Sequence, residues 1–193
     1  MIVEGIVTSQ NADGLMNVAP MGPIVHGDFE SLTLRPFQTS TTFRNLNETR
    51  CGVFHVVDSV VLLARAAVGT LQTGPETTPA LEVDGRVLKD CCRWFEFRIS
   101  DCDLSDPRTI LQAEVVARGE VRPFFGFNRA RHAVLEAAIL ATRVHLLDQE
   151  DIQAQMGVLK SAVEKTGGVA EQDSFAMLEE YISSSADSRH ESR

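Results

Sequence analysis

The chain has 193 residues and a formal net charge of −9, with 44% hydrophobic and 23% charged residues. This length and composition indicate an ordinary soluble globular protein that builds its core without disulfides or a structural metal. The acidic balance argues against a dedicated nucleic-acid-binding protein. No apolar run approaches the roughly 20 residues of a membrane helix, and residues 1–5 lack the pattern of a signal peptide, so we expect a cytoplasmic protein without a membrane partner.

The first 125 residues carry the pattern of a β-rich domain. Residues 2–21 predict a hairpin, because β-branched segments flank the turn signal Asn11-Ala12-Asp13-Gly14. Short helices are predicted at 41–50, capped by Ser40 or Thr41, and at 58–68. Residues 72–79 are rich in Thr, Pro and Gly and predict a loop. Further strands are predicted at 29–34, 51–57, 92–100 and 109–122, with a tight turn at 83–87.

The last third of the chain changes to a helical period. Asn128 is a candidate cap for a helix that runs to about residue 147, with apolar residues at steps of three and four. A second helix begins near residue 149 and ends at Gly167-Gly168, and a third spans 174–182 behind Asp173. The Ser-rich, charged residues that follow predict a disordered tail. The expected class is mainly β with α: a barrel or sandwich over 1–125, a helical extension over 126–183 and a tail over 184–193.

Several motifs of catalytic sites are absent from the sequence. It contains no G-x-G-x-x-G, no P-loop, no G-x-S-x-G and no H-E-x-x-H. The cysteines form no C-x-x-C pair and have no histidine-rich surroundings, so we predict buried thiols and no metal site. They are Cys51, Cys91, Cys92 and Cys102.

Two polar segments are candidates for a binding site. The first, residues 17–22, reads Asn-Val-Ala-Pro-Met-Gly at the end of a predicted strand. Its small residues leave backbone groups within reach of a flat ligand. The alternative interpretation is a strand that ends in a Pro/Gly turn.

The second segment lies at a predicted junction between strand and helix. Residues 39–42 are four consecutive hydroxyl residues, and Arg35 and Arg44 flank them. Hydroxyls, free N–H groups at a helix start and a guanidinium together are what a phosphate group requires. The alternative is a simple N-cap loop rich in Ser and Thr.

Together these segments resemble the FMN-binding split β-barrel superfamily of flavin-reductase-like proteins. That superfamily carries an N-x-A-P-like segment, then K/R-D-T-x-x-N-I/L before a short helix, then a strand of the form G-x-F-V-V-N. Here residues 17–20 match the first element, Thr42 and Asn45 match the Thr and Asn of the second, and residues 52–58 match the third. The Lys-Asp pair of the second element is replaced by Ser-Thr, so one cation is missing there.

The sequence resembles one branch more closely, the family called "domain of unknown function 447". Its members share the start I-V-E-x-I-V-T, matched by residues 2–8, and the R-P-F segment, matched by 35–37. They also carry a helix that begins N-R-A, matched by 128–130, and continues with segments matched by 133–147. The resemblance covers about residues 1–150.

The resemblance implies a split β-barrel with a C-terminal helical extension, paired as a homodimer that binds FMN non-covalently at the interface. It implies that Arg35, or an arginine of the partner chain, replaces the missing cation and that Asn45 orients the phosphate loop. The groups implied to bind the phosphate are Thr39, Thr41 and Thr42. The groups implied to face the flavin ring are Asn17, Ala19, Pro20 and Met21.

The implied function is that of an FMN-dependent oxidoreductase with an unspecified substrate and electron donor. Two alternatives stay open: a flavin carrier or sensor without turnover, and a barrel that has lost flavin and serves as an assembly partner. No residue is identifiable as an obligate acid or base, and flavin hydride transfer requires none. Arg129, Arg143 and His145 are candidate additions to the site, or members of a salt-bridged helix face.

Overall fold

The structure is a computed structural model that describes residues 1–71 and 73–190, with side chains through Ser185. The chain forms two compact units. The strand unit comprises Met1–Asp58 and Thr73–Phe124, and the helical unit comprises Ser59–Gln72 and Phe125–Arg193. The helical unit therefore uses two separate segments of the chain, whereas the sequence predicts a continuous extension over 126–183.

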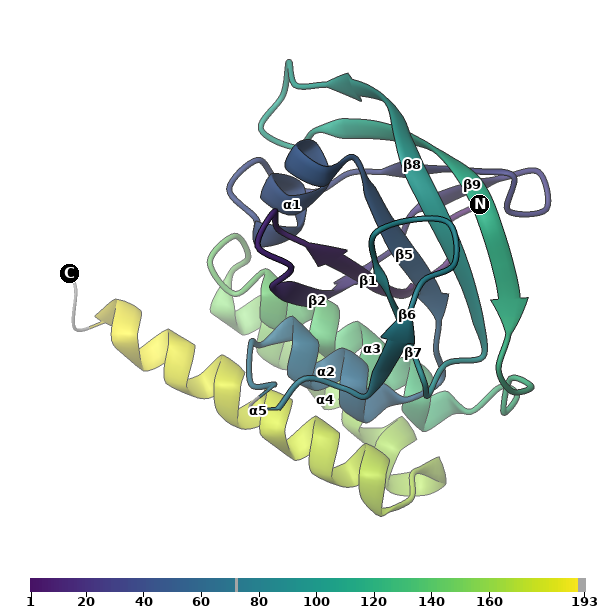
Figure 1. The fold of residues 1–193 in the computed structure, drawn as a ribbon. Coiled ribbons are helices and arrows are strands. Elements are labelled where there is room, and N and C mark those ends of the chain that lie inside the picture. Colours follow the sequence, from purple (N-terminus) through teal and green to yellow (C-terminus); the bar gives the residue numbers. More distant parts are fainter. Residues whose placement is uncertain (72, 191–193) are drawn as a thin grey trace. The chain divides into compact units, whose positions relative to one another are not determined.

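The strand unit is built around a curled, antiparallel seven-stranded sheet (Figure 1). Its strand order is β2-β1-β5-β8-β9-β4-β3, so β2 and β3 lie at the edges. A two-stranded sheet of β6 and β7 accompanies it. The strands are β1 (Gly5–Gln10), β2 (Met16–Met21), β3 (Ile24–His26), β4 (Ser31–Leu34), β5 (Cys51–Val56), β6 (Thr77–Pro79), β7 (Arg86–Leu88), β8 (Arg93–Asp103) and β9 (Ile110–Glu120).

The predicted hairpin is confirmed as β1 and β2, which pair from Gly5–Met21 to Gln10–Met16. Gly14 has a φ of 79°, a backbone conformation that favours glycine. The Asn11 side chain accepts a hydrogen bond from the Leu15 N–H at 2.8 Å. Local turn chemistry therefore sets the register of the two strands.

The two faces of this sheet carry different elements, as the neighbours Thr8 and Ser9 on β1 show. The Thr8 hydroxyl donates to the Arg86 carbonyl on β7 at 2.6 Å. The Ser9 hydroxyl accepts from the Asn45 amide on helix α1 (Thr41–Thr49) at 3.2 Å. Because adjacent residues of a strand point to opposite faces, α1 and the β6–β7 hairpin lie on opposite faces of β1. On the α1 face, the core includes Val7, Leu32, Leu34, Phe43, Leu46, Phe54, Phe95, Phe97 and Leu111.

The structure contains three short strands that the sequence does not predict. β3, β6 and β7 have three residues each, too few to show an alternating pattern. The predicted loop at 72–79 contains β6, which pairs with β7 from Thr77–Leu88 to Pro79–Arg86. Tertiary pairing, not local composition, makes these residues extended.

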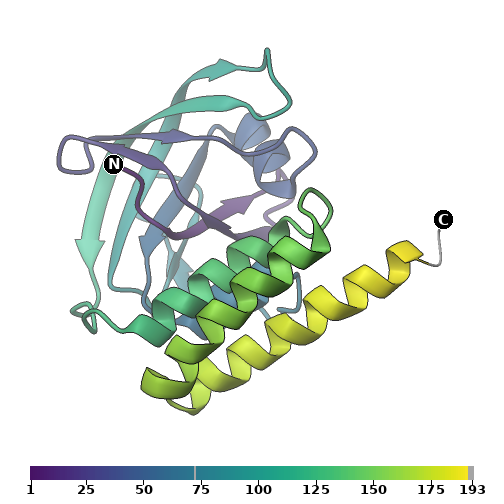
Figure 2. The same ribbon diagram turned by 180° about the vertical axis from the view of Figure 1, so that it is seen from behind.

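The helical unit contains α2 (Val60–Ala67), α3 (Arg129–Thr142), α4 (Gln149–Thr166) and α5 (Val169–His190). The three C-terminal helices lie side by side (Figure 2). Asn128 caps α3 by accepting from the Arg131 N–H at 3.0 Å, as predicted. α2 belongs to this unit because its buried Val60 and Ala64 join the apolar cluster of the other helices.

Two helix ends differ from the predictions. α3 ends at Thr142 instead of residue 147, because the Arg143 N–H bonds to the Leu140 carbonyl and tightens the chain into turns. α5 begins at Val169 instead of 174, where the Glu171 carboxylate accepts from the Gly168 N–H at 2.9 Å. It continues through 184–190, which the sequence predicts to be disordered, while 191–193 of the predicted tail lie outside the described residues. Among the described helices, none combines the length and apolarity that a bilayer crossing requires.

Candidate functional site

The two polar segments found in the sequence meet in the strand unit. The Asn17 side chain on β2 donates from Nδ2 to Thr42 Oγ1, at the start of α1, over 3.0 Å. Asn17 is half-buried and Thr42 is 4% exposed. The edge strand β2 and the N-terminus of α1 are therefore held together by side chains 25 residues apart in sequence.

The register of β2 separates its candidate residues into two sets. Asn17, Ala19 and Met21 pair with Ser9, Val7 and Gly5 and share the face that carries α1. Pro20 pairs with Ile6 on the opposite face, so only its backbone could serve the same ligand. β2 is an edge strand, which leaves backbone groups on its outer side unpaired by the sheet and accommodates a proline that has no N–H.

The first turn of α1 offers unused donors. Ser40 is the N-cap, and its hydroxyl accepts from the Phe43 N–H at 3.1 Å, as predicted. The Arg44 N–H bonds to the Ser40 carbonyl. Neither the Thr41 nor the Thr42 N–H has a hydrogen-bond acceptor among residues 1–71 and 73–190. Two N–H groups and the positive end of the helix dipole therefore point out of this turn.

Arg44 is the cation that approaches the hydroxyl segment. Its exposed guanidinium donates to the Thr39 carbonyl and to Thr41 Oγ1, both at 3.0 Å. The spacing of three from Thr41 to Arg44 puts both residues on one face of α1. The implied role of Arg35, or of an arginine of a partner chain, at the phosphate stays a prediction. In the part of the chain that is described, no hydrogen bond or ion pair joins the Arg35 side chain to the hydroxyl residues; its carbonyl accepts from Arg108 Nε at 3.1 Å.

Asn45 positions α1 from inside the fold. Its side chain is 5% exposed and donates to Ser9 Oγ. The helix is thereby fixed to β1 one turn beyond its N-terminus. Ser9 was not predicted, and nothing in the local sequence around it signals this contact.

The segment before α1 is anchored to the turn between β8 and β9. The Gln38 amide donates to the carbonyls of Leu104 and Asp106 at 3.0 and 2.9 Å, and the Thr109 hydroxyl donates to the Pro36 carbonyl at 2.9 Å. These bonds hold the hydroxyl residues at the start of α1.

The remaining titratable groups in the described part of the chain serve the fold. Among the described residues no group of three His, Cys, Asp or Glu side chains could hold a metal ion. All four cysteines are free thiols, as predicted, although Cys102 is only partly buried. Burial raises the pKa of Cys91 to about 11, so this thiol is not a nucleophile at neutral pH.

His55 is buried on the sheet face that carries the β6–β7 hairpin. Its Nε2 accepts from the Leu88 N–H at 3.1 Å, and its Nδ1 lies 3.3 Å from the Ile6 carbonyl, to which it donates in this tautomer. Burial lowers the pKa of His55 to about 4, partly opposed by the Ile6 carbonyl. His55 therefore links three strands as a neutral ring.

The sequence profile described as "Protein of unknown function (DUF447) N-terminal domain" matches residues 3–122, and a second one, "Protein of unknown function (DUF447)", matches 128–180. The chain belongs to the DUF447 family. The two matched parts of the chain cover β1 to β9, and α3, α4 and the first part of α5. No curated protein sequence matches it.

Solved structures show the same fold. The FMN-bound DUF447 protein MM1853 from Methanosarcina mazei superposes with a TM-score of 0.80 and 26% identity, covering 93% of this chain and 94% of that one. The 2-nitrobenzoate 2-nitroreductase NbaA of Pseudomonas fluorescens gives 0.52 and 23%, over 61% and 64% of the two chains. An FMN-binding protein from Thermus thermophilus gives 0.52 and 11%, over 61% and 71%. The expected split-barrel fold, mainly β with α, is thereby confirmed.

Proposed function

We propose that the protein binds FMN non-covalently, with the phosphate at the N-terminus of α1 and the flavin ring along β2, and that it acts as an FMN-dependent oxidoreductase. The observation that carries the proposal is the Asn17–Thr42 contact, which brings the edge strand beside two unpaired N–H groups. The FMN-bound relative from Methanosarcina mazei, similar over 93% of this chain, supports the same cofactor.

The donor set fits a phosphate group. Thr41 offers a backbone N–H and an exposed hydroxyl, Thr42 offers a second N–H, and Arg44 supplies the charge beside them. Thr42 Oγ1 already accepts from Asn17, so its own proton is available to a further acceptor. A dianionic phosphate is stabilised by such charge-assisted hydrogen bonds and by the helix dipole.

The edge strand fits a flat ring. Ala19 is small, and the half-buried Asn17 and Met21 flank it on the α1 face. Unpaired backbone N–H and C=O groups on the outer side of β2 can bond to the polar edge of a flavin. When bound, FMN supplies the hydride or electron transfer; the residues of this chain hold it in place and limit its exposure to water.

A homodimer is part of the proposal. Every residue of β2 is half-buried in the single chain, so a flavin ring bound along this strand remains open to solvent on one side. A second copy over this edge would cover the ring and the unpaired strand. The flavin-reductase-like resemblance of the sequence supports that arrangement, and the oligomeric state of the purified protein tests it.

A carrier or sensor without turnover is the second candidate. Residues 17–22 and 39–45 contain one ionisable side chain, Arg44, and therefore no proton donor or acceptor for a substrate. Hydride transfer to and from a flavin requires none, so this composition fits both candidates.

The test is the visible spectrum of the purified protein, followed by anaerobic mixing with reduced nicotinamide cofactor. An oxidoreductase takes up FMN and its flavin absorbance bleaches on the timescale of turnover. A carrier takes up FMN and bleaches only with a chemical reductant. A protein that stays colourless after incubation with FMN contradicts both.

A further inference from the structure

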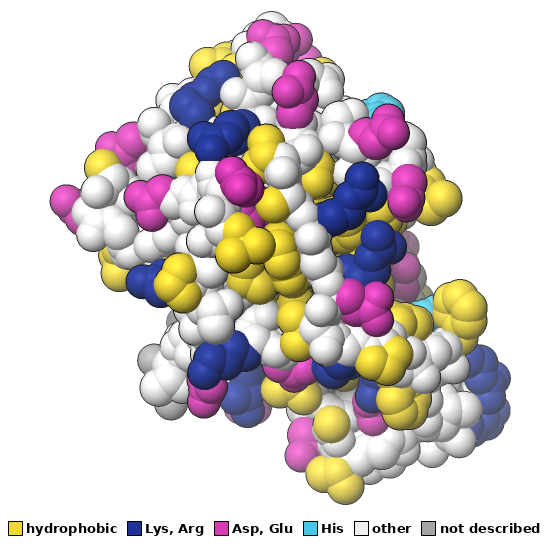
Figure 3. Space-filling model, turned by 45° about the vertical axis from the view of Figure 1, so that its right-hand side comes forward, with side chains coloured by type: hydrophobic (Ala, Val, Ile, Leu, Met, Phe, Trp, Pro, Cys, Tyr) yellow, Lys and Arg dark blue, Asp and Glu magenta, His cyan; other side chains and the backbone are white. Residues whose placement is uncertain are grey.

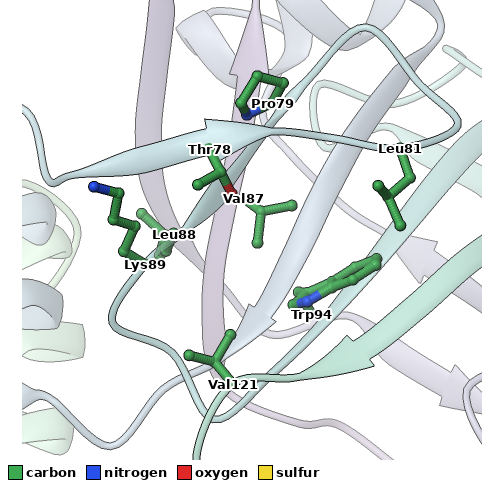
Figure 4. Close-up of a pocket in the computed structure, with 8 residues that line it drawn as sticks. All are labelled: Thr78, Pro79, Leu81, Val87, Leu88, Lys89, Trp94 and Val121. Atoms are coloured by element: carbon green, nitrogen blue, oxygen red, sulfur yellow. The ribbon is translucent and has the colours of Figure 1, made fainter.

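A concave surface lies on the opposite face of the sheet from α1. It is a pocket of about 370 Å³ in the strand unit, beside the β6–β7 hairpin (Figure 4). Its lining is mostly apolar and consists of Thr78, Pro79, Leu81, Val87, Leu88, Lys89, Trp94 and Val121. None of the residues proposed to hold FMN belongs to it.

Trp94 forms a flat wall of this pocket. It pairs with Gly119 across β8 and β9, and a Cβ atom added to Gly119 would lie 2.5 Å from Trp94 Cζ2. The indole therefore lies directly on the backbone of β9, and only glycine permits that contact. Trp94 is half-buried and faces the space between Leu81 and Val121 in Figure 4. Trp94 also packs against the buried cluster of Cys51, Val53, Val83 and Val87, and the part of the indole that lines the pocket is available for stacking.

Glu96 fixes the opposite wall. Its carboxylate is fully buried and accepts from the N–H groups of Leu81 and Glu82, both at 2.7 Å, and of Val83 at 3.3 Å. Three bonds to one charged group hold this loop firmly. Leu81 is 75% exposed beside the indole, and Val121 is 48% exposed on the other side. Hydrophobic side chains also gather on the β8–β9 side of the molecule in Figure 3.

The pocket carries one charge. Lys89 is the only ionisable lining residue and the only lysine among residues 1–147. Its Nζ lies 3.0 Å from Glu76, but both side chains are largely exposed, 54% and 82%. Exposed ion pairs of this kind contribute at most about 1 kcal/mol, so an anionic ligand can compete with Glu76 for the ammonium group.

We propose that this pocket binds a small planar aromatic anion, with the ring stacked on Trp94 and the acidic group at Lys89. The volume lies near the lower end of the roughly 300–1,000 Å³ of small-molecule sites. The ring is recognised by Trp94, Leu81 and Val121, and the anion by the one cationic side chain. The site is independent of the proposed flavin site because it lies on the other face of β1 and β5.

The test is calorimetric titration with naphthalene-2-sulfonate and with its neutral analogue naphthalene-2-sulfonamide. Trp94 is the only tryptophan, so its fluorescence reports occupancy of this pocket. We expect saturable binding of the sulfonate with a change in that fluorescence. Lys89→Met should weaken the sulfonate about fivefold, which corresponds to about 1 kcal/mol, and leave the sulfonamide unchanged.

A pair of charge variants locates the site. Val121→Glu places a carboxylate at the pocket and should weaken the sulfonate, whereas Val116→Glu adds the same charge to β9 outside the lining and should not. Absence of saturable binding, or equal effects of Lys89→Met on both ligands, would overturn the proposal. Flavin uptake is read separately from visible absorbance, so failure here leaves the proposed function untouched.

Discussion

The side-chain amide of Asn17 donates to the hydroxyl of Thr42 over 3.0 Å and so joins the edge strand β2 to the first turn of α1. This one bond sets the position of the proposed ring surface relative to the proposed phosphate donors. Without it, the two half-sites would be connected through β1, by the Asn45–Ser9 hydrogen bond and the packing of α1 on that strand.

Asn17→Ala should therefore weaken FMN binding by about tenfold, since a hydrogen bond that positions a site contributes on the order of 1 kcal/mol. The matched control is Asn47→Ala, which alters an exposed residue of α1 and should bind FMN normally. Quenching of flavin fluorescence measures both affinities. If the two variants bind FMN with equal affinity, Asn17 does not contribute to the site.

Arg44→Met should lower the affinity for FMN five- to tenfold, which corresponds to about 1 kcal/mol for a partly exposed charge. Riboflavin, which lacks the phosphate, should bind this variant as it binds the parent protein. Arg44→Lys keeps the charge and should recover part of the loss. The FMN affinity of Arg44→Met should also depend less on salt concentration. An equal loss for riboflavin would show that Arg44 acts on the fold and not on the phosphate.

The stability of the strand unit should fall as the pH drops from about 6.5 to about 4. His55 has a lowered pKa of about 4 in the folded protein and an ordinary value near 6.5 in the unfolded chain. In this window the unfolded chain binds more protons, so stability rises with pH, by about 3 kcal/mol in total. Denaturant unfolding followed by Trp94 fluorescence measures it.

The exposed His145 provides the control for this pH dependence. The variant His145→Gln removes an exposed imidazole outside the strand unit and should keep the full dependence. A free energy of unfolding that is flat between pH 6.5 and 4 would contradict the assignment of His55 as a neutral buried ring.

Glu96→Gln should lower the free energy of unfolding by about 2–4 kcal/mol. In the variant, the side-chain amide nitrogen would face backbone N–H groups that bond to a carboxylate in the parent protein. Glu114→Gln, at an exposed position of β9, should have little effect. Chemical denaturation measures both variants. If Glu96→Gln unfolds at the same denaturant concentration as the parent, the carboxylate is not what holds the 81–83 loop.

The sequence predicted those turns and helix caps that depend on contacts between residues close together in the chain. The Asn11–Gly14 turn, the Ser40 cap of α1 and the Asn128 cap of α3 each act within a few residues and appear where expected. The strand order depends on pairing across the chain and was not predicted. The resemblance to a family implied only a split barrel in which the β2 and α1 segments bind one ligand.

Other features could not be read from the sequence. The membership of α2 in the helical unit depends on which apolar cluster Val60 and Ala64 join. The pocket depends on the register that places Gly119 opposite Trp94, and a shift by one residue would remove it. Arg129, Arg143 and His145 are exposed in the helical unit, and their contribution to the site stays a prediction.

The most direct test of the account compares the affinities of FMN and riboflavin for the parent protein, Thr41→Pro and Thr41→Val. Thr41 is the first residue of α1, where proline keeps the helix and removes the N–H together with the hydroxyl. Ser40 has a ψ of 149°, which suits the residue before a proline. Valine removes the hydroxyl but keeps the N–H.

The parent protein should bind FMN about 100-fold more tightly than riboflavin, as expected for several bonds to a charged phosphate. Thr41→Pro should reduce the ratio of the FMN affinity to the riboflavin affinity about tenfold, and Thr41→Val should reduce this ratio less. A parent protein that binds the two flavins equally, or binds neither, would contradict a phosphate site at the N-terminus of α1.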